Sequence, residues 1–211
     1  MKRKYNSVFS KIIISVIVFL FTVVSIQYLD TGIAARVMHL LMSSRTLHKI
    51  TRHIPDILPH LVGVGTILMW IIYIRRSRVK KDDIKSRFLR LAATSLPAAY
   101  IFKTFFKFMF GRTNPRTWLI KREPLGFHWF NETLGGSFPS GHMTVFTAFG
   151  VAVMIYFPQY RWLVIILLIL LGIALIGTDY HFLSDVIAGT YLGTITTYFI
   201  NYFYENKPIN S

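Results

Sequence analysis

Two histidines lie in sequence surroundings that suit phosphate chemistry. His142 follows Pro139-Ser140-Gly141 at the start of a hydrophobic segment. The backbone N–H groups at a helix start are unpaired and carry the positive end of the helix dipole, so they favour an anion. His181 and Asp185 are four residues apart, which places both on one helical face. A carboxylate there holds an imidazole in one tautomer and leaves its other nitrogen directed at a substrate. This pattern suggests phosphoryl transfer through a histidine nucleophile.

The same side chains are compatible with other roles. A histidine at a helix terminus is often only a hydrogen-bonded structural residue, and two histidines with a carboxylate are common zinc ligands. The Pro-Ser-Gly sequence before His142 favours an anion site over a metal site, because successive backbone N–H groups form an anion-binding nest. We therefore expect neither a metal nor a cofactor. Asp179 is close in sequence and is a possible helix cap, and we assign it no chemistry.

The composition is that of a membrane protein. Of the 211 residues, 53% are hydrophobic, and several runs approach the roughly 20 apolar residues that cross a bilayer. The net charge is +15. With so much apolar sequence, anionic lipid head groups are better partners for this charge than nucleic acid. No cysteine, internal repeat or long linker occurs, so residues 1–211 are expected to form one membrane domain. The sequence does not indicate an oligomeric state.

Six apolar segments predict an all-α, polytopic membrane protein with six transmembrane helices. The segment after the basic residues 2–4 resembles a signal peptide, but no small-x-small cleavage site follows promptly. We interpret it as a retained first span. Residues 30–56 alternate basic and apolar positions, which favours an amphipathic segment on a membrane surface over a solvated loop. The six predicted spans are residues 12–26, 57–74, 88–110, 139–158, 162–177 and 185–204.

Basic residues predict the orientation of these helices. The strongest basic cluster is in residues 75–81, and cytoplasmic loops carry such an excess of Lys and Arg. Both termini are then cytoplasmic. Three polar clusters, at residues 112–115, 139–142 and 181–185, fall together on the extracytoplasmic face. We expect a bacterial inner membrane protein with its active site facing the periplasm or the outside of the cell.

Three cations near the end of the third span need an explanation. Lys103 and Lys107 are four residues apart, and charged residues at such depth face a cavity or extend to the interface. We expect Lys103 to extend to the membrane surface and Lys107 to bind phosphate. Arg112 offers a planar fork for phosphate oxygens. The aromatic residues of this region are expected to form an interfacial belt rather than to stack on bases; they are Trp118, Phe127, Trp129 and Phe130.

These residues resemble the type 2 phosphatidic acid phosphatases, six-span membrane lipid phosphatases related to vanadium haloperoxidases. The three motifs of that family are Lys-x6-Arg-Pro, Pro-Ser-Gly-His and Ser-Arg-x5-His-x3-Asp. The middle motif is complete at residues 139–142. The third keeps His181 and Asp185, with Ala174-Leu175 in place of Ser-Arg, and the first reads Lys107 followed by Asn114-Pro115. The resemblance covers about residues 88–203.

The resemblance implies a metal-independent mechanism. His181 would attack phosphorus and form a phosphohistidine while Asp185 orients it. His142 would protonate the leaving alkoxide and then activate water. The groups expected to hold the phosphate oxygens are Lys107, Arg112, Ser140 and the Gly141 N–H.

Two departures from the motifs bear on activity. Asn114 and Leu175 replace arginines, and losing one transition-state donor typically costs about 10²–10³ in rate. We expect Arg112 to replace one of them. The predicted function is hydrolysis of a lipid phosphomonoester or pyrophosphate, such as phosphatidic acid, phosphatidylglycerol phosphate, a polyprenyl pyrophosphate or lipid A. The alternatives are a lipid phosphotransferase using the same site and a non-catalytic protein that binds or transports lipid phosphates.

Overall fold

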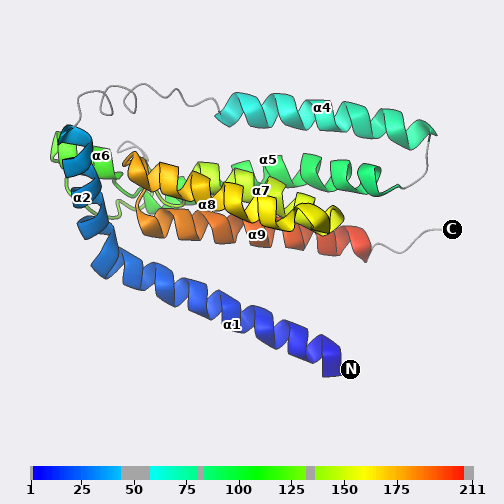
Figure 1. Ribbon diagram of the computed structural model, residues 1–211, viewed down its shortest axis with the longest axis horizontal. Coiled ribbons are helices and arrows are strands. Elements are labelled where there is room, and N and C mark those ends of the chain that lie inside the picture. The colour runs from blue at the N-terminus through cyan, green and yellow to red at the C-terminus, as the bar shows by residue number, and fades with distance from the viewer. Residues whose placement is uncertain (1, 44–57, 80–82, 132–135, 207–211) are drawn as a thin grey trace.

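The computed structural model, which describes residues 2–43, 58–79, 83–131 and 136–206, is a bundle of long helices (Figure 1). In the described residues, β-pairing is confined to one antiparallel bridge between Arg112 and Phe127. The described part of each predicted apolar segment is mainly helical, so the all-α prediction is confirmed. The elements are α1 (Lys2–Val24), η1 (Ser25–Leu29), α2 (Asp30–Ser43), α4 (Leu58–Val79), α5 (Ile84–Phe110), α6 (Pro115–Lys121), α7 (Gly141–Tyr156), η2 (Pro158–Tyr160), α8 (Arg161–Gly177) and α9 (Leu183–Glu205).

Two helical stretches of the described chain are long and apolar enough to cross a bilayer by length and composition alone. These are Phe9–Ser43 and Pro158–Gly177, and Gly141–Tyr156 is a shorter apolar helix. The other long helices carry more polar residues. That six helices span the bilayer therefore stays a prediction.

Close packing of α7 on α9 brings together the two helices that carry the predicted site. A Cβ atom added to Gly189 would lie 2.5 Å from the carbonyl oxygen of Ser140, and one added to Gly193 would lie 2.2 Å from that of Thr144. The Thr197 hydroxyl, one further turn along α9, donates to an α7 carbonyl at 3.0 Å. This small-xxx-small spacing lets membrane helices approach closely. The contact fixes the start of α7 beside the start of α9.

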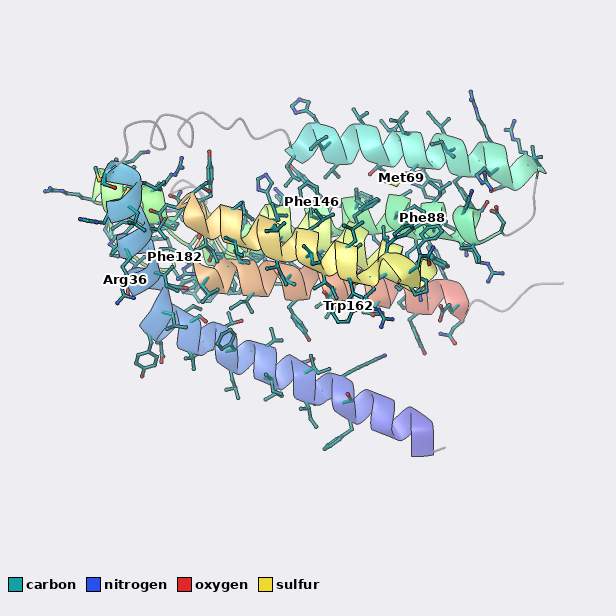
Figure 2. The ribbon with its side chains drawn as sticks, in the orientation of Figure 1. Arg36, Met69, Phe88, Phe146, Trp162 and Phe182 are labelled. Atoms are coloured by element: carbon teal, nitrogen blue, oxygen red, sulfur yellow. The ribbon has the colours of Figure 1, made fainter. Side chains whose placement is uncertain are left out.

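The N-terminal helix bends where it meets the end of the bundle. The π-helical turn η1 separates α1 from α2, and such turns change the direction of a helix. Figure 1 shows α2 lying steeply to α1, next to α6. Arg36 points outward at this end of the molecule (Figure 2), whereas the buried side chains of α2 share one face; they are Asp30, Ala34, Met38 and Leu41. The amphipathic pattern is thus confirmed over residues 30–43, its position on a membrane surface stays a prediction, and residues 44–56 lie outside the described part of the chain.

The three polar clusters lie at one end of the bundle. The beginnings of α1 and α5, the end of α9 and the basic end of α4 are at the opposite end (Figure 1). Phe182 is at the end covered by α2, and Phe88 and Trp162 are at the other (Figure 2). This arrangement agrees with the predicted topology. Which end faces the cytoplasm stays a prediction.

Candidate active site

Both predicted catalytic histidines line one cavity of about 440 Å³. Residues from four helices and three connecting segments contribute to its wall. No aspartate or glutamate is among the described residues that line it, whereas two lysines are. The cavity therefore suits an anion. Its lining residues include Leu58, Lys103, Lys107, Asn114, Gly136, Ser137, Gly141, His142, Ala174, Leu175, Tyr180 and His181.

Ser140 sets the start of α7. Its side chain accepts from the Met143 N–H at 3.4 Å as the N-cap, and its own N–H donates to the Asp185 carbonyl at 3.0 Å. Gly141 and His142 are consequently in the first turn of the helix, and both line the cavity. Ser140 is buried and does not line the cavity. Its predicted contact with phosphate stays a prediction.

His181 is held where the α8–α9 loop turns back. The backbone N–H groups of Tyr180 and His181 donate to the Leu175 carbonyl at 3.1 and 3.3 Å. The His181 Nδ1 atom lies 3.5 Å from Asp185 Oδ2, a long distance for a hydrogen bond, but bonds of this kind often shorten when substrate binds. Burial lowers the pKa of His181 below its ordinary value of 6.5. The hydrogen bond and charge of Asp185 raise this pKa, whereas the Lys107 charge lowers it further, and the lowering prevails. The lowered pKa favours the neutral imidazole, which is the form that a histidine nucleophile would need.

Arg112 is engaged with the carboxylate that orients His181. Its Nη1 donates to Asp185 Oδ1 and to the Ser184 hydroxyl, both at 2.6 Å, and its Nη2 donates to Asp30 Oδ2 at 2.7 Å. The ring of Phe182 lies 4.4 Å from the guanidinium carbon, and only 3% of the arginine is exposed. Arg112 does not line the cavity. A phosphate contact of Arg112 stays a prediction, and it would require the guanidinium to leave these partners.

Three residues of this cluster were not predicted from the sequence, namely Asp30, Ser137 and Ser184. Asp30 is buried and also accepts from the backbone N–H of Ser184 at 3.1 Å and from its hydroxyl. Ser137 donates to Asp185 Oδ2 at 2.5 Å. One signal was available, because Asp30 is the first acidic residue of the chain and follows a long apolar run. An acidic residue in such a segment is a functional candidate by default.

Lys103 lies in the cavity wall, so the expectation that it extends to the membrane surface is wrong. The residue is 9% exposed, and its Nζ atom lies 4.0 Å from the centre of the Tyr100 ring. Its stem occupies space that Gly141 leaves free, since a Cβ on that glycine would be 3.2 Å from Lys103 Cδ. Lys107, one turn further along α5, lines the same cavity. Among the described residues, no three His, Cys, Asp or Glu side chains are grouped to hold a metal ion.

Asp179 is a buried carboxyl group beside the site. It follows the C-terminal end of α8 in a left-handed conformation (φ 53°), and the N-cap of α9 is Phe182 instead. Its Oδ2 atom has no hydrogen-bond partner within the described structure. Burial raises the pKa of Asp179 to about 7, although the Arg116 charge acts against this rise. Asp179 is thus partly protonated near neutral pH.

We expect Asp179→Asn to stabilise the protein at pH 8. The raised pKa means that the folded chain holds a proton that the unfolded chain loses, so stability falls as pH rises from about 4 through 7. Asparagine carries no charge and tolerates the left-handed conformation. Thermal unfolding midpoints measured from pH 4 to 8 check this. The midpoint of the variant should fall less with rising pH than the midpoint of the wild type. Identical pH profiles would contradict it.

Comparison with known proteins agrees with these motifs. The family model described as the PAP2 superfamily matches residues 88–209, which is more than half of the chain. The chain belongs to the PAP2 superfamily. The resemblance noted from the sequence is therefore confirmed, and the match contains every predicted site residue. Asp30 lies outside it.

A solved PAP2 structure has a similar fold. The crystal structure of a transmembrane PAP2-type phosphatidylglycerolphosphate phosphatase from Bacillus subtilis superposes with a TM-score of 0.53 over 93% of this chain and 98% of that one. The identity is 19%. At this identity, the agreement concerns the fold alone.

Two curated relatives share a short, similar stretch with this chain. The lipid A 1-phosphatases of Rhizobium etli and Rhizobium johnstonii are each 46% identical over 57 residues, or 27% of this chain. The match spans only about a quarter of the length of these relatives, 25% and 23% respectively. What those proteins act on thus bears on this chain as a proposal only.

Proposed function

We propose that this PAP2-superfamily chain is an integral membrane lipid phosphatase that works through a phosphohistidine. One observation carries the proposal. His142, in the first turn of α7, and His181, in the α8–α9 loop, line one cavity that also contains two lysines and, among the described residues, no carboxylate. Such a cavity favours a phosphate between a nucleophile and a proton donor.

The reaction has two steps. Because Asp185 faces Nδ1 of His181, Nε2 is the atom that attacks phosphorus. The bond from phosphorus to the lipid oxygen breaks, and protonated His142 gives its proton to the leaving alkoxide. A water molecule then loses a proton to His142 and attacks phosphorus. The phosphorus–nitrogen bond breaks, which releases inorganic phosphate and restores His181.

Charge and position supply the catalysis. Lys107 and the first turn of α7 face the phosphate oxygens, while Arg112 acts as a positioning residue through Asp185. Asp185 stabilises the positive charge that develops on His181. If a second lipid alcohol replaced water, the same phosphohistidine would make the protein a phosphotransferase.

Purified full-length protein with a panel of lipid phosphates tests this proposal. The panel contains lipid A 1-phosphate and phosphatidylglycerol phosphate, which the relatives suggest, with phosphatidic acid and a polyprenyl pyrophosphate. We expect phosphate release in the presence of a chelator and inhibition by vanadate. A requirement for added metal would contradict metal independence. Transfer to a second lipid without free phosphate would indicate the phosphotransferase, and no turnover on any lipid would indicate a binding protein.

The proposed orientation predicts opposite labelling at the two ends of the bundle. The chain has no cysteine, so single cysteines report accessibility without background. Lys121→Cys, at the exposed end of α6, should react with an impermeant maleimide in intact spheroplasts. Arg78→Cys, exposed at the end of α4, should react only after lysis. The reverse pattern would place the site in the cytoplasm.

A further inference from the structure

The cavity lacks the guanidinium groups that the family motifs would provide. Asn114 and Leu175 occupy those two motif positions, and both line the cavity. Arg112 has its terminal nitrogens on Asp30, Ser184 and Asp185, outside the cavity. Among the described lining residues, the lysine and arginine side chains are two lysines on α5. One of them, Lys107, is the motif lysine, and the other is not part of any motif.

We propose that Lys103 is a second phosphate-binding lysine, which supplies the positive charge that the motif arginines supply in other members of the family. The proposal rests on the proposed function and deepens it. The ligand is the dianionic phosphate group of the substrate. Its negative charge would then be held by two ammonium groups and a helix N-terminus, without a guanidinium.

The position of the Lys103 side chain favours this role. Measured from an ideal Cβ on Gly141, Lys103 Cδ is at 3.2 Å, and Cε and Nζ are both at 3.7 Å. The stem therefore runs along the first turn of α7, and the ammonium lies beside it. Backbone N–H groups in a first turn are a ready anion site. Lys107 follows four residues later on the same face of α5, so both ammonium groups reach the wall of one cavity.

The burial of Lys103 also needs compensation. Removing an ammonium group from water is costly unless charge or hydrogen bonds offset it. The face of Tyr100, 4.0 Å from Nζ, offsets part of this cost, since a cation over an aromatic ring gains about 0.5–2 kcal/mol. A phosphate dianion in the cavity would add a full opposite charge beside the ammonium.

Lys103→Met is the decisive variant. Methionine keeps most of the length of the stem and removes the charge, so the thermal midpoint without ligand should not fall. We expect kcat/KM for a lipid phosphate to drop by about 10²–10³, as for loss of one oxyanion donor, and the inhibition constant of inorganic phosphate to rise. The increase in thermal midpoint caused by inorganic phosphate should shrink as well. Lys85→Met, an exposed lysine at the other end of α5, is the matched control and should match wild type in all three.

The outcomes separate this inference from the proposed function. If wild type turns over and Lys103→Met keeps its kcat/KM and its response to phosphate, the inference is overturned and the function stands. If wild type neither turns over nor responds to phosphate, the function fails and the inference fails with it. If wild type responds to phosphate without turnover, the response of Lys103→Met decides alone. Should Lys103→Met not fold, Lys103→Gln provides the same comparison.

Discussion

His181→Ala should abolish turnover, with a loss of at least about 10⁴-fold. The proposed nucleophile is absent from this variant, and removing one member of a catalytic set costs about as much as removing the whole set. Release of inorganic phosphate from a lipid phosphate measures the loss. A labelled phosphate group should remain on wild-type protein after rapid quenching in base, where phosphohistidine survives, and should be missing from His181→Ala.

His142→Ala separates the two steps of the reaction. With a lipid substrate, both steps slow, because neither the leaving alkoxide nor the water has a proton partner. With a nitrophenyl phosphate, the leaving group needs no proton, so about one nitrophenolate per chain should appear before hydrolysis stalls. His39→Ala, an exposed histidine on α2, should behave as wild type. Full turnover by His181→Ala, or steady wild-type turnover by His142→Ala, would remove these assignments.

Asp30→Ala should lower both stability and turnover. Removing one partner of a buried ion pair leaves an uncompensated charge and costs about 3–5 kcal/mol. Here the Arg112 guanidinium loses one of its two carboxylates, and the Ser184 N–H and hydroxyl lose their acceptor. The formal charge of this cluster is −1, from two carboxylates and the Arg112 guanidinium. This negative charge favours the positive charge that forms on His181 during attack. Asp30→Ala removes one of the two carboxylates and so weakens this stabilisation.

Chemical unfolding in detergent and kcat at a temperature where all variants are folded measure the two effects separately. Asp30→Asn keeps the shape of the side chain, so a drop in its kcat reports the lost charge more than lost packing. Glu205→Ala, at the exposed end of α9, is the matched control. A free energy of unfolding for Asp30→Ala within about 0.5 kcal/mol of wild type would show that the cluster does not depend on this carboxylate.

The helices were predictable because their signals are local. The apolar run that became α8 has a proline before it, and α5 starts after Asp83, which accepts from the Ser86 N–H as an N-cap. His181 does lie beside Asp185, but the two do not share a helical face as expected, because His181 is in the loop before α9 and the turn at the Phe182 N-cap brings it to the carboxylate. The Gly189–Gly193 spacing is a local signal for close helix packing.

The rest of the site depends on contacts between distant parts of the chain, which no local sequence pattern predicts. Asp30 meets Arg112 across 82 positions of sequence and Ser184 across 154. Their pairing depends on the angle at which α2 crosses the bundle, which hydrophobic periodicity does not encode. The position of Lys103 depends on the missing side chain of Gly141 on another helix. A lysine near the end of a membrane helix is expected to extend to the interface. Only the contact with Gly141 shows that Lys103 does not.

The π-helical turn at Ser25–Leu29 has a consequence for the register of the whole N-terminal segment. A π turn holds about one residue more than an α turn, and Asp30 comes directly after it. Since each helical residue advances the side chain by roughly 100°, shortening this turn by one residue would swing the carboxylate a quarter of the way or more around the helix axis. A deletion of one residue in α1 or η1 would therefore not be neutral. The extra residue of the π turn sets the direction in which Asp30 points, and so allows it to reach Arg112 and Ser184.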